Sequence, residues 1–190
     1  MNWKEVQEAV AEQKRTILLY GEIDGEMDVK VKKALTYFNL QSAEEVTMFI
    51  DSGGGKIANA FSIYDCIRSS KAPVKAVVMG NCFSAAVTVM LACNTRIATR
   101  HSFVMTHFVR NRCVEVFCSD TDEEAERRMF EASRKNAAAI VKIYCERTGC
   151  NPERARDLMK RGELVEIKYS ADEAKELGFI TEVVDTYPYL

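Results

Sequence analysis

The chain has 190 residues, a formal net charge of −2 at pH 7 and 28% charged residues, a size and composition that allow one well-buried core. This balance gives no electrostatic basis for binding nucleic acid or a membrane surface, and no apolar run reaches the roughly 18 residues that a membrane-spanning helix needs. Seven cysteines, none in a Cys-x-x-Cys pair, and only two histidines predict reduced thiols, no metal site and a cytoplasmic location.

Strand-like and helix-like segments alternate through the first hundred residues. Residues 1–14 are polar and amphipathic and are expected to form an N-terminal arm. Strands are then expected at 16–20, 46–50 and 74–79, and helices at 29–38, at 57–69 and after Ser84. Repeating units of this kind predict parallel strands with right-handed crossovers, and therefore an α/β fold.

The second half of the chain carries clear helix boundaries. Short strands are expected at 96–98 and 102–105, and residues 112–118 alternate like a strand or a hairpin arm. Thr121 and Glu124 form a capping-box pattern, after which nothing interrupts a helix before Gly149. Such a long helix either projects to a neighbouring subunit or lies along its own domain. Later elements are expected to be a helix at 152–161, a capped helix from Ser170 to Gly178 and a strand at 180–184.

The most informative stretch is the corner at residues 80–86, where Ser84 stands between an apolar strand and a buried helix. A serine hydroxyl needs a fixed, exposed position beside a base to act as a nucleophile. A strand–helix corner fixes it and directs backbone N–H groups toward a developing oxyanion. The alternatives are a small residue that merely fits a tight corner, or Cys82 as the nucleophile.

The base is limited to two histidines. His107 ends a strand-like run, whereas His101 sits in a polar turn and is expected to be solvated, so His107 is the favoured partner of Ser84. Spacing alone does not locate the acid that would orient it. The candidates are Asp157, Glu163, Glu166 and Asp172. Glu166 is favoured because its run is partly apolar, while a first helical turn already explains Asp172.

A glycine turn at 53–55 supplies the expected oxyanion donors. Glycines let the backbone approach a ligand closely, and the N–H groups of Gly55 and Ala85 are the candidate pair. A merely flexible turn is the alternative. A phosphate-binding loop is excluded because Ile50 replaces the required glycine and Ile57 follows Lys56 where Ser or Thr is needed.

These motifs together resemble the proteolytic subunit of the ATP-dependent Clp protease, in colinear order from about residue 15 to residue 185. The matching segments are the glycine turn at 53–55, Ser-Ile-Tyr-Asp at 62–65, the corner at 79–84, Val-Met-x-His at 104–107 and the capped helix at 170–178. The resemblance implies a crotonase-like fold of stacked strand–helix units, a single domain at 15–190 and a handle-like segment at about 110–150.

The same resemblance implies a serine endopeptidase that cleaves unfolded polypeptides inside stacked heptameric rings, fed by a separate AAA+ unfoldase. The implied nucleophile is Ser84, the base His107, the acid Glu166 where the family has aspartate, and the oxyanion donors Gly55 and Ala85. No cofactor is implied. Departures from the family pattern at 53, 82–83, 85 and 108–109 leave a silent structural subunit as an alternative. A crotonase-type acyl-CoA enzyme is disfavoured because residues 85–106 contain no Asp or Glu.

Overall fold

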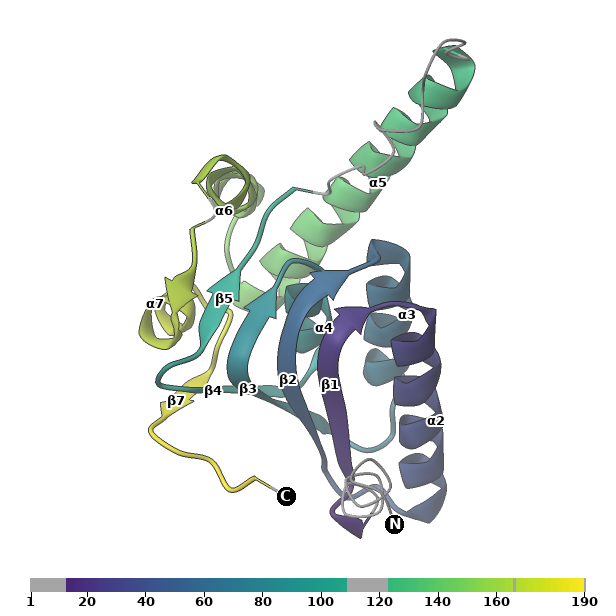
Figure 1. The fold of residues 1–190 in the computed structure, drawn as a ribbon, viewed down its shortest axis with the longest axis vertical. Coiled ribbons are helices and arrows are strands. Elements are labelled where there is room, and N and C mark those ends of the chain that lie inside the picture. The colour runs from purple at the N-terminus through teal and green to yellow at the C-terminus, as the bar shows by residue number, and fades with distance from the viewer. Residues whose placement is uncertain (1–12, 109–122, 166, 190) are drawn as a thin grey trace.

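The computed structural model describes residues 13–108, 123–165 and 167–189. Strands and helices alternate through most of these segments (Figure 1). The elements are β1 (Thr16–Ile23), α2 (Gly25–Gln41), β2 (Val46–Gly55), α3 (Ile57–Arg68), β3 (Val74–Phe83), α4 (Ala85–Ala92), β4 (Thr95–Thr99), β5 (Phe103–Met105), α5 (Glu123–Thr148), α6 (Pro152–Val165), β6 (Tyr169–Ser170), α7 (Ala171–Glu176) and β7 (Glu182–Val184).

One predominantly parallel sheet organises the described residues, which confirms the α/β prediction. Its main order is β1-β2-β3-β4-β7, with every pair parallel, while β5 pairs in parallel with β3 and antiparallel with β6. Helices α2, α3 and α4 contribute the main hydrophobic core with one face of the sheet. The opposite face carries a smaller apolar cluster, onto which Tyr187 of the C-terminal segment packs.

Strand β3 changes its partner halfway along its length. Residues 75–78 pair with β4, and residues 81–83 pair with β5. The change occurs at Gly80, which has a φ of +120° and where a Cβ would lie 2.7 Å from the Asp51 carboxylate. That carboxylate accepts a 2.9 Å hydrogen bond from Asn81 N. The strand therefore continues to Phe83, beyond the end at residue 79 that the sequence predicts.

The glycine segment also differs from the sequence prediction, which expects a turn at 53–55. Residues 51–55 are part of β2 rather than a turn, because the strand shifts register after Ile50 and pairs Gly54 and Gly55 with the end of β1. Buried Ser52 fixes this segment by donating to Gly21 O at 2.5 Å and accepting from Gly54 N at 3.1 Å. The pairing with β1 involves residues far away in the sequence, so the glycine run by itself indicates only a turn.

Two arginines join the C-terminal ends of three helices. Arg96 is 6% exposed and donates to Phe179 O at 2.7 Å, just beyond α7, and to Arg147 O at the end of α5. Arg147 in turn donates to Leu91 O and Cys93 O at the end of α4, at 2.7 and 2.9 Å. Cations are favourable at helix C-termini, where carbonyl groups lack partners within the helix. The pair therefore fixes α4, α5 and α7 relative to one another.

Helix α5 leaves the body of the molecule and extends well beyond the sheet (Figure 1). Only its last turns join the core, through buried Ile140, Val141 and Tyr144. The predicted strand or arm at 112–118, most of the predicted N-terminal arm and the first two residues of the predicted 121–148 helix lie outside the described residues. No helix in the described part is long and apolar enough to cross a membrane.

Gly54→Ala is expected to lower the free energy of unfolding by about 2–4 kcal/mol. The new Cβ would lie 2.6 Å from Phe83 O and 2.8 Å from Ser84 Cβ, at a φ of +93°. Gly53→Ala is the matched control, since nothing lies within 4 Å of a Cβ there. Urea denaturation of both variants measures the difference, and equal stabilities would contradict this close packing.

Arg96→Met is expected to lower the free energy of unfolding by about 2–4 kcal/mol, because it leaves buried carbonyl oxygens without a donor. Arg68→Met at the exposed end of α3 is the control and should change stability by less than about 0.5 kcal/mol. Thermal and urea denaturation provide the comparison. A loss in Arg96→Met no larger than the control's would show that the helix ends do not depend on this guanidinium.

Candidate functional site

Ser84 occupies the sharp corner between β3 and α4. Its φ is +55° and its ψ −123°, and Arg15 is the only other non-glycine residue with a positive φ among the described residues. The neighbouring strand fixes the corner, because Ser84 N donates to Met105 O at 2.7 Å. Non-glycine residues adopt such backbone angles only where surrounding contacts enforce them, and these positions concentrate at functional sites. Ser84, a half-buried residue, therefore stands at a strained position that the neighbouring strand holds.

The end of β2 packs directly against this corner. A Cβ at Gly54 would lie 2.8 Å from Ser84 Cβ and 2.9 Å from Ala85 N, so no side chain fits between the two segments. Gly55 faces the other way, toward Ile23 of β1. The sequence singled out Gly55 and missed that Gly54 makes this contact. The Gly55 N–H nevertheless belongs to the peptide bond that directly follows the Gly54 Cα.

His107 lies two residues beyond β5, the strand that pairs with the end of β3. Its ring is half-buried, and Nδ1 lies 2.5 Å from Phe108 O. A carbonyl oxygen can only accept, so Nδ1 donates in this contact, and in the neutral tautomer with that proton Nε2 is the acceptor. No hydrogen bond joins His107 to Ser84 or to any carboxylate within the described part of the chain. The structure thus sets the two residues just beyond the ends of the adjacent strands β3 and β5, without a direct bond.

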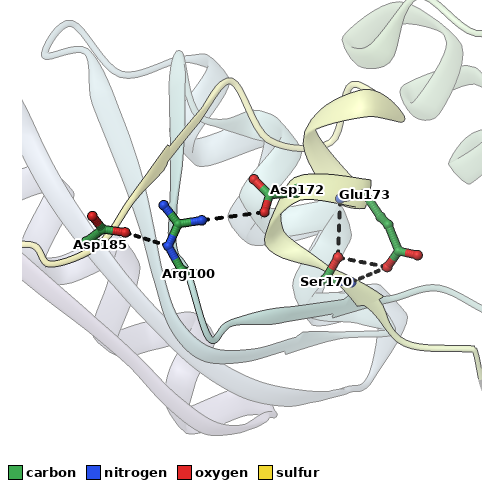
Figure 2. A network of polar contacts seen from close by, with 5 residues as sticks. All are labelled: Arg100, Ser170, Asp172, Glu173 and Asp185. Carbon is green, nitrogen blue, oxygen red and sulfur yellow. Dashed lines mark hydrogen bonds and ion pairs between the residues drawn. The ribbon is translucent and has the colours of Figure 1, made fainter.

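His101 lies in the exposed turn between β4 and β5, as the sequence predicts. Its neighbour Arg100 forms the polar network of Figure 2, with Nε 2.5 Å from Asp185 Oδ1 and Nη1 3.7 Å from Asp172 Oδ2. All three side chains are largely exposed, so the ion pairs contribute little stability. The network lies beside the N-terminus of α7, where Ser170 and Glu173 form the predicted capping box.

The four candidate acids differ in what surrounds them. Asp172 pairs with Arg100, and Asp157 pairs with Arg161 at 3.0 Å and with Arg154 at 3.4 Å. Both carboxylates are therefore engaged by arginines at the surface. Glu166 and the side chain of Glu163 lie outside the described residues.

Cys82 is not a credible nucleophile. Its thiol is fully buried, 3.7 Å from the Met90 sulfur, and burial raises its pKa, so the reactive thiolate does not form near neutral pH. The five cysteines of the described segments are all free thiols, and no cluster of metal-ligating side chains occurs there.

Comparison with known proteins assigns this architecture to a family. The Clp protease family model matches residues 2–187. The ATP-dependent Clp protease proteolytic subunit 2 of Treponema denticola is 30% identical over 172 residues, which cover 89% of this chain and 81% of that protein. The ATP-dependent Clp protease proteolytic subunit of Chlorella vulgaris is 27% identical over 180 residues, covering 90% of this chain and 83% of that protein.

Solved structures agree with the sequence comparison. ClpP1 from Listeria monocytogenes superposes with a TM-score of 0.74 at 27% identity, over 96% of this chain and 97% of that chain. A point mutant of the same Listeria protein gives a TM-score of 0.80 at 26% identity, over 95% of this chain and 96% of that chain. These likenesses confirm the stacked strand–helix fold that the sequence motifs predict, and the chain belongs to the Clp protease family.

Proposed function

We propose that this chain is a serine endopeptidase with Ser84 as nucleophile, His107 as general base and Glu166 as the acid that orients the imidazole. The observation that carries the proposal is the strained Ser84 corner, held against the glycine end of β2 and beside the strand that leads to His107. Membership of the Clp protease family supports the same reaction class.

The chemistry follows from these positions. Ser84 Oγ attacks the carbonyl carbon of a peptide bond while His107 Nε2 takes the hydroxyl proton. The negative charge that forms on the carbonyl oxygen is stabilised by the N–H groups of Gly55 and Ala85. His107 then gives its proton to the departing amine, and a water molecule hydrolyses the acyl-serine by the same steps in reverse order.

Two contacts of the segment after position 166 support Glu166 as the acid. Val104 pairs with Tyr169 in the antiparallel β5–β6 ladder, so the segment after position 166 runs beside the strand that leads to His107. Lys168 Nζ lies 5.2 Å from the centre of the Phe83 ring, so this segment also reaches the residue before Ser84. A carboxylate there would replace Phe108 O as the acceptor of the Nδ1 proton.

The substrates and partners of the proposed enzyme follow from its family. Unfolded polypeptides are the expected substrate class, stacked heptameric rings of this chain the expected assembly, and an AAA+ unfoldase the expected source of substrate. The silent structural subunit is the second candidate. The observation that favours it is the missing Ser84–His107 hydrogen bond among the described residues.

A fluorophosphonate probe is expected to form one adduct, at Ser84, in the assembled protein. Ser84→Ala should abolish it, and His107→Ala should slow it about 10²–10⁴-fold because the hydroxyl loses its base. His101→Ala is the control and should label at the normal rate, since His101 is exposed in a turn. Intact-mass and peptide mass spectrometry locate the adduct. An unlabelled ring would support the silent subunit, and an adduct on Cys82 would overturn the choice of nucleophile.

Glu166→Gln is expected to slow labelling of Ser84 by about 10²-fold or more, because an amide no longer stabilises the charged imidazole. Asp172→Asn is the matched control, since that carboxylate pairs with Arg100 at the surface. Labelling rates at fixed probe concentration measure both variants. Slow Ser84 labelling in Asp172→Asn together with normal labelling in Glu166→Gln would assign the acid role to Asp172 instead.

A further inference from the structure

We propose that Tyr144 is a positioning residue, whose buried hydroxyl fixes Thr106 and thereby sets the place of the His107 imidazole. The expected effect on catalysis rests on the proposed function, whereas the placement of the His107 ring by Thr106 and Tyr144 does not.

A side-chain hydrogen bond links helix α5 to the histidine-bearing segment. Thr106 Oγ1 and the Tyr144 hydroxyl lie 2.5 Å apart, although the residues are 38 positions apart in the sequence. Thr106 is 0% exposed and Tyr144 2% exposed, so neither hydroxyl reaches solvent. Each is satisfied by the other, and removing one leaves a buried polar group without this partner.

The contact lies directly beyond the end of strand β5. Strand β5 ends at Met105, whose carbonyl accepts the hydrogen bond from Ser84 N. Thr106 and His107 follow outside any strand, so side-chain contacts must fix the backbone there. Because Thr106 is bonded to His107 through one peptide unit, a displaced Thr106 displaces the imidazole as well.

Tyr144 is itself held rigidly enough to serve as the anchor. Its ring packs edge-on against Phe179 with centroids 5.3 Å apart. One turn later, Arg147 fastens the helix to the carbonyl of Leu91 at the end of α4. Burial raises the pKa of the Tyr144 phenol, which therefore keeps its proton and its capacity to donate.

The histidine count makes a direct test possible, because the chain has only His101 and His107. In assembled, deuterated protein carrying ¹³C,¹⁵N-histidine, Tyr144→Phe and Thr106→Val are expected to shift or broaden the His107 imidazole signals. The His101 signals, from an exposed turn, should stay in place. Thr106→Ser keeps the hydroxyl and is expected to retain the wild-type His107 signals.

Thr148→Val is the matched control for lost stability. Its hydroxyl donates to Tyr144 O at 2.8 Å and accepts from Cys150 N at 3.3 Å, and within the described residues it forms no hydrogen bond with Thr106 or His107. This variant is expected to lower the melting temperature as much as Tyr144→Phe does, with unchanged His107 signals. Should Tyr144→Phe fail to fold, the Thr106→Val and Thr106→Ser pair decides the question alone.

Ser84 labelling in the same variants separates this inference from the proposed function. With a saturable peptidyl phosphonate, Tyr144→Phe and Thr106→Val should label about tenfold more slowly at saturation, as a misplaced catalytic group would, with unchanged half-saturation. Unchanged His107 signals in both variants would overturn the positioning role, even if wild-type protein labels normally. His107 signals that respond in a protein that never labels would uphold the positioning role and reject the proposed protease.

Discussion

The change of partner within β3 is the constraint on which the rest of the site depends. Below Gly80 the strand pairs with β4, and above it the strand pairs with β5. Without that change, the strand that ends at Ser84 would not run beside the segment that leads to His107. Two hydrogen bonds fix the chain at this change of partner. Asn81 N donates to the Asp51 carboxylate, and Gly80 N donates to Ser102 Oγ at 3.2 Å. Asp51 therefore has a structural role at this change of partner.

The paired arginines explain how a projecting helix can be fixed at its base. Burial, and after it the like charge of Arg147, lower the pKa of Arg96. Their neighbours are carbonyl oxygens at helix ends, whose partial negative charges compensate the guanidinium groups without a buried carboxylate. Helix α4 begins directly after Ser84 and ends at this cluster, so one short helix connects the Ser84 corner to the base of α5.

The sequence predicts the elements well where the information is local. Periodicity locates the strands and helices of the first hundred residues, and the Ser170–Glu173 capping box is found where predicted. The glycine run indicates a turn when taken alone, because strand pairing with β1 leaves no local pattern. Strand β6 escapes prediction because two residues are too few for any periodicity to appear.

The site shows the same division between local and long-range information. The corner at Ser84 follows from a strand, a small residue and a helix in immediate succession, and its positive φ agrees with that. The contact of Gly54 with that corner, and the Thr106–Tyr144 pair, join segments that are far apart in the chain. No local sequence pattern predicts these two contacts, so they are found only in the folded structure. The roles of Ser84, His107, Glu166, Gly55 and Ala85 stay predictions.

In the proposed mechanism, the hydrogen bond at His107 Nδ1 must pass from Phe108 O to a carboxylate. A neutral carbonyl, Phe108 O, now accepts that proton, and a hydrogen bond to a carboxylate is stronger by roughly 1 kcal/mol. A carboxylate within reach would therefore displace the carbonyl and turn the ring. With His107 as the proposed base, the charged imidazole would favour a carboxylate more strongly still.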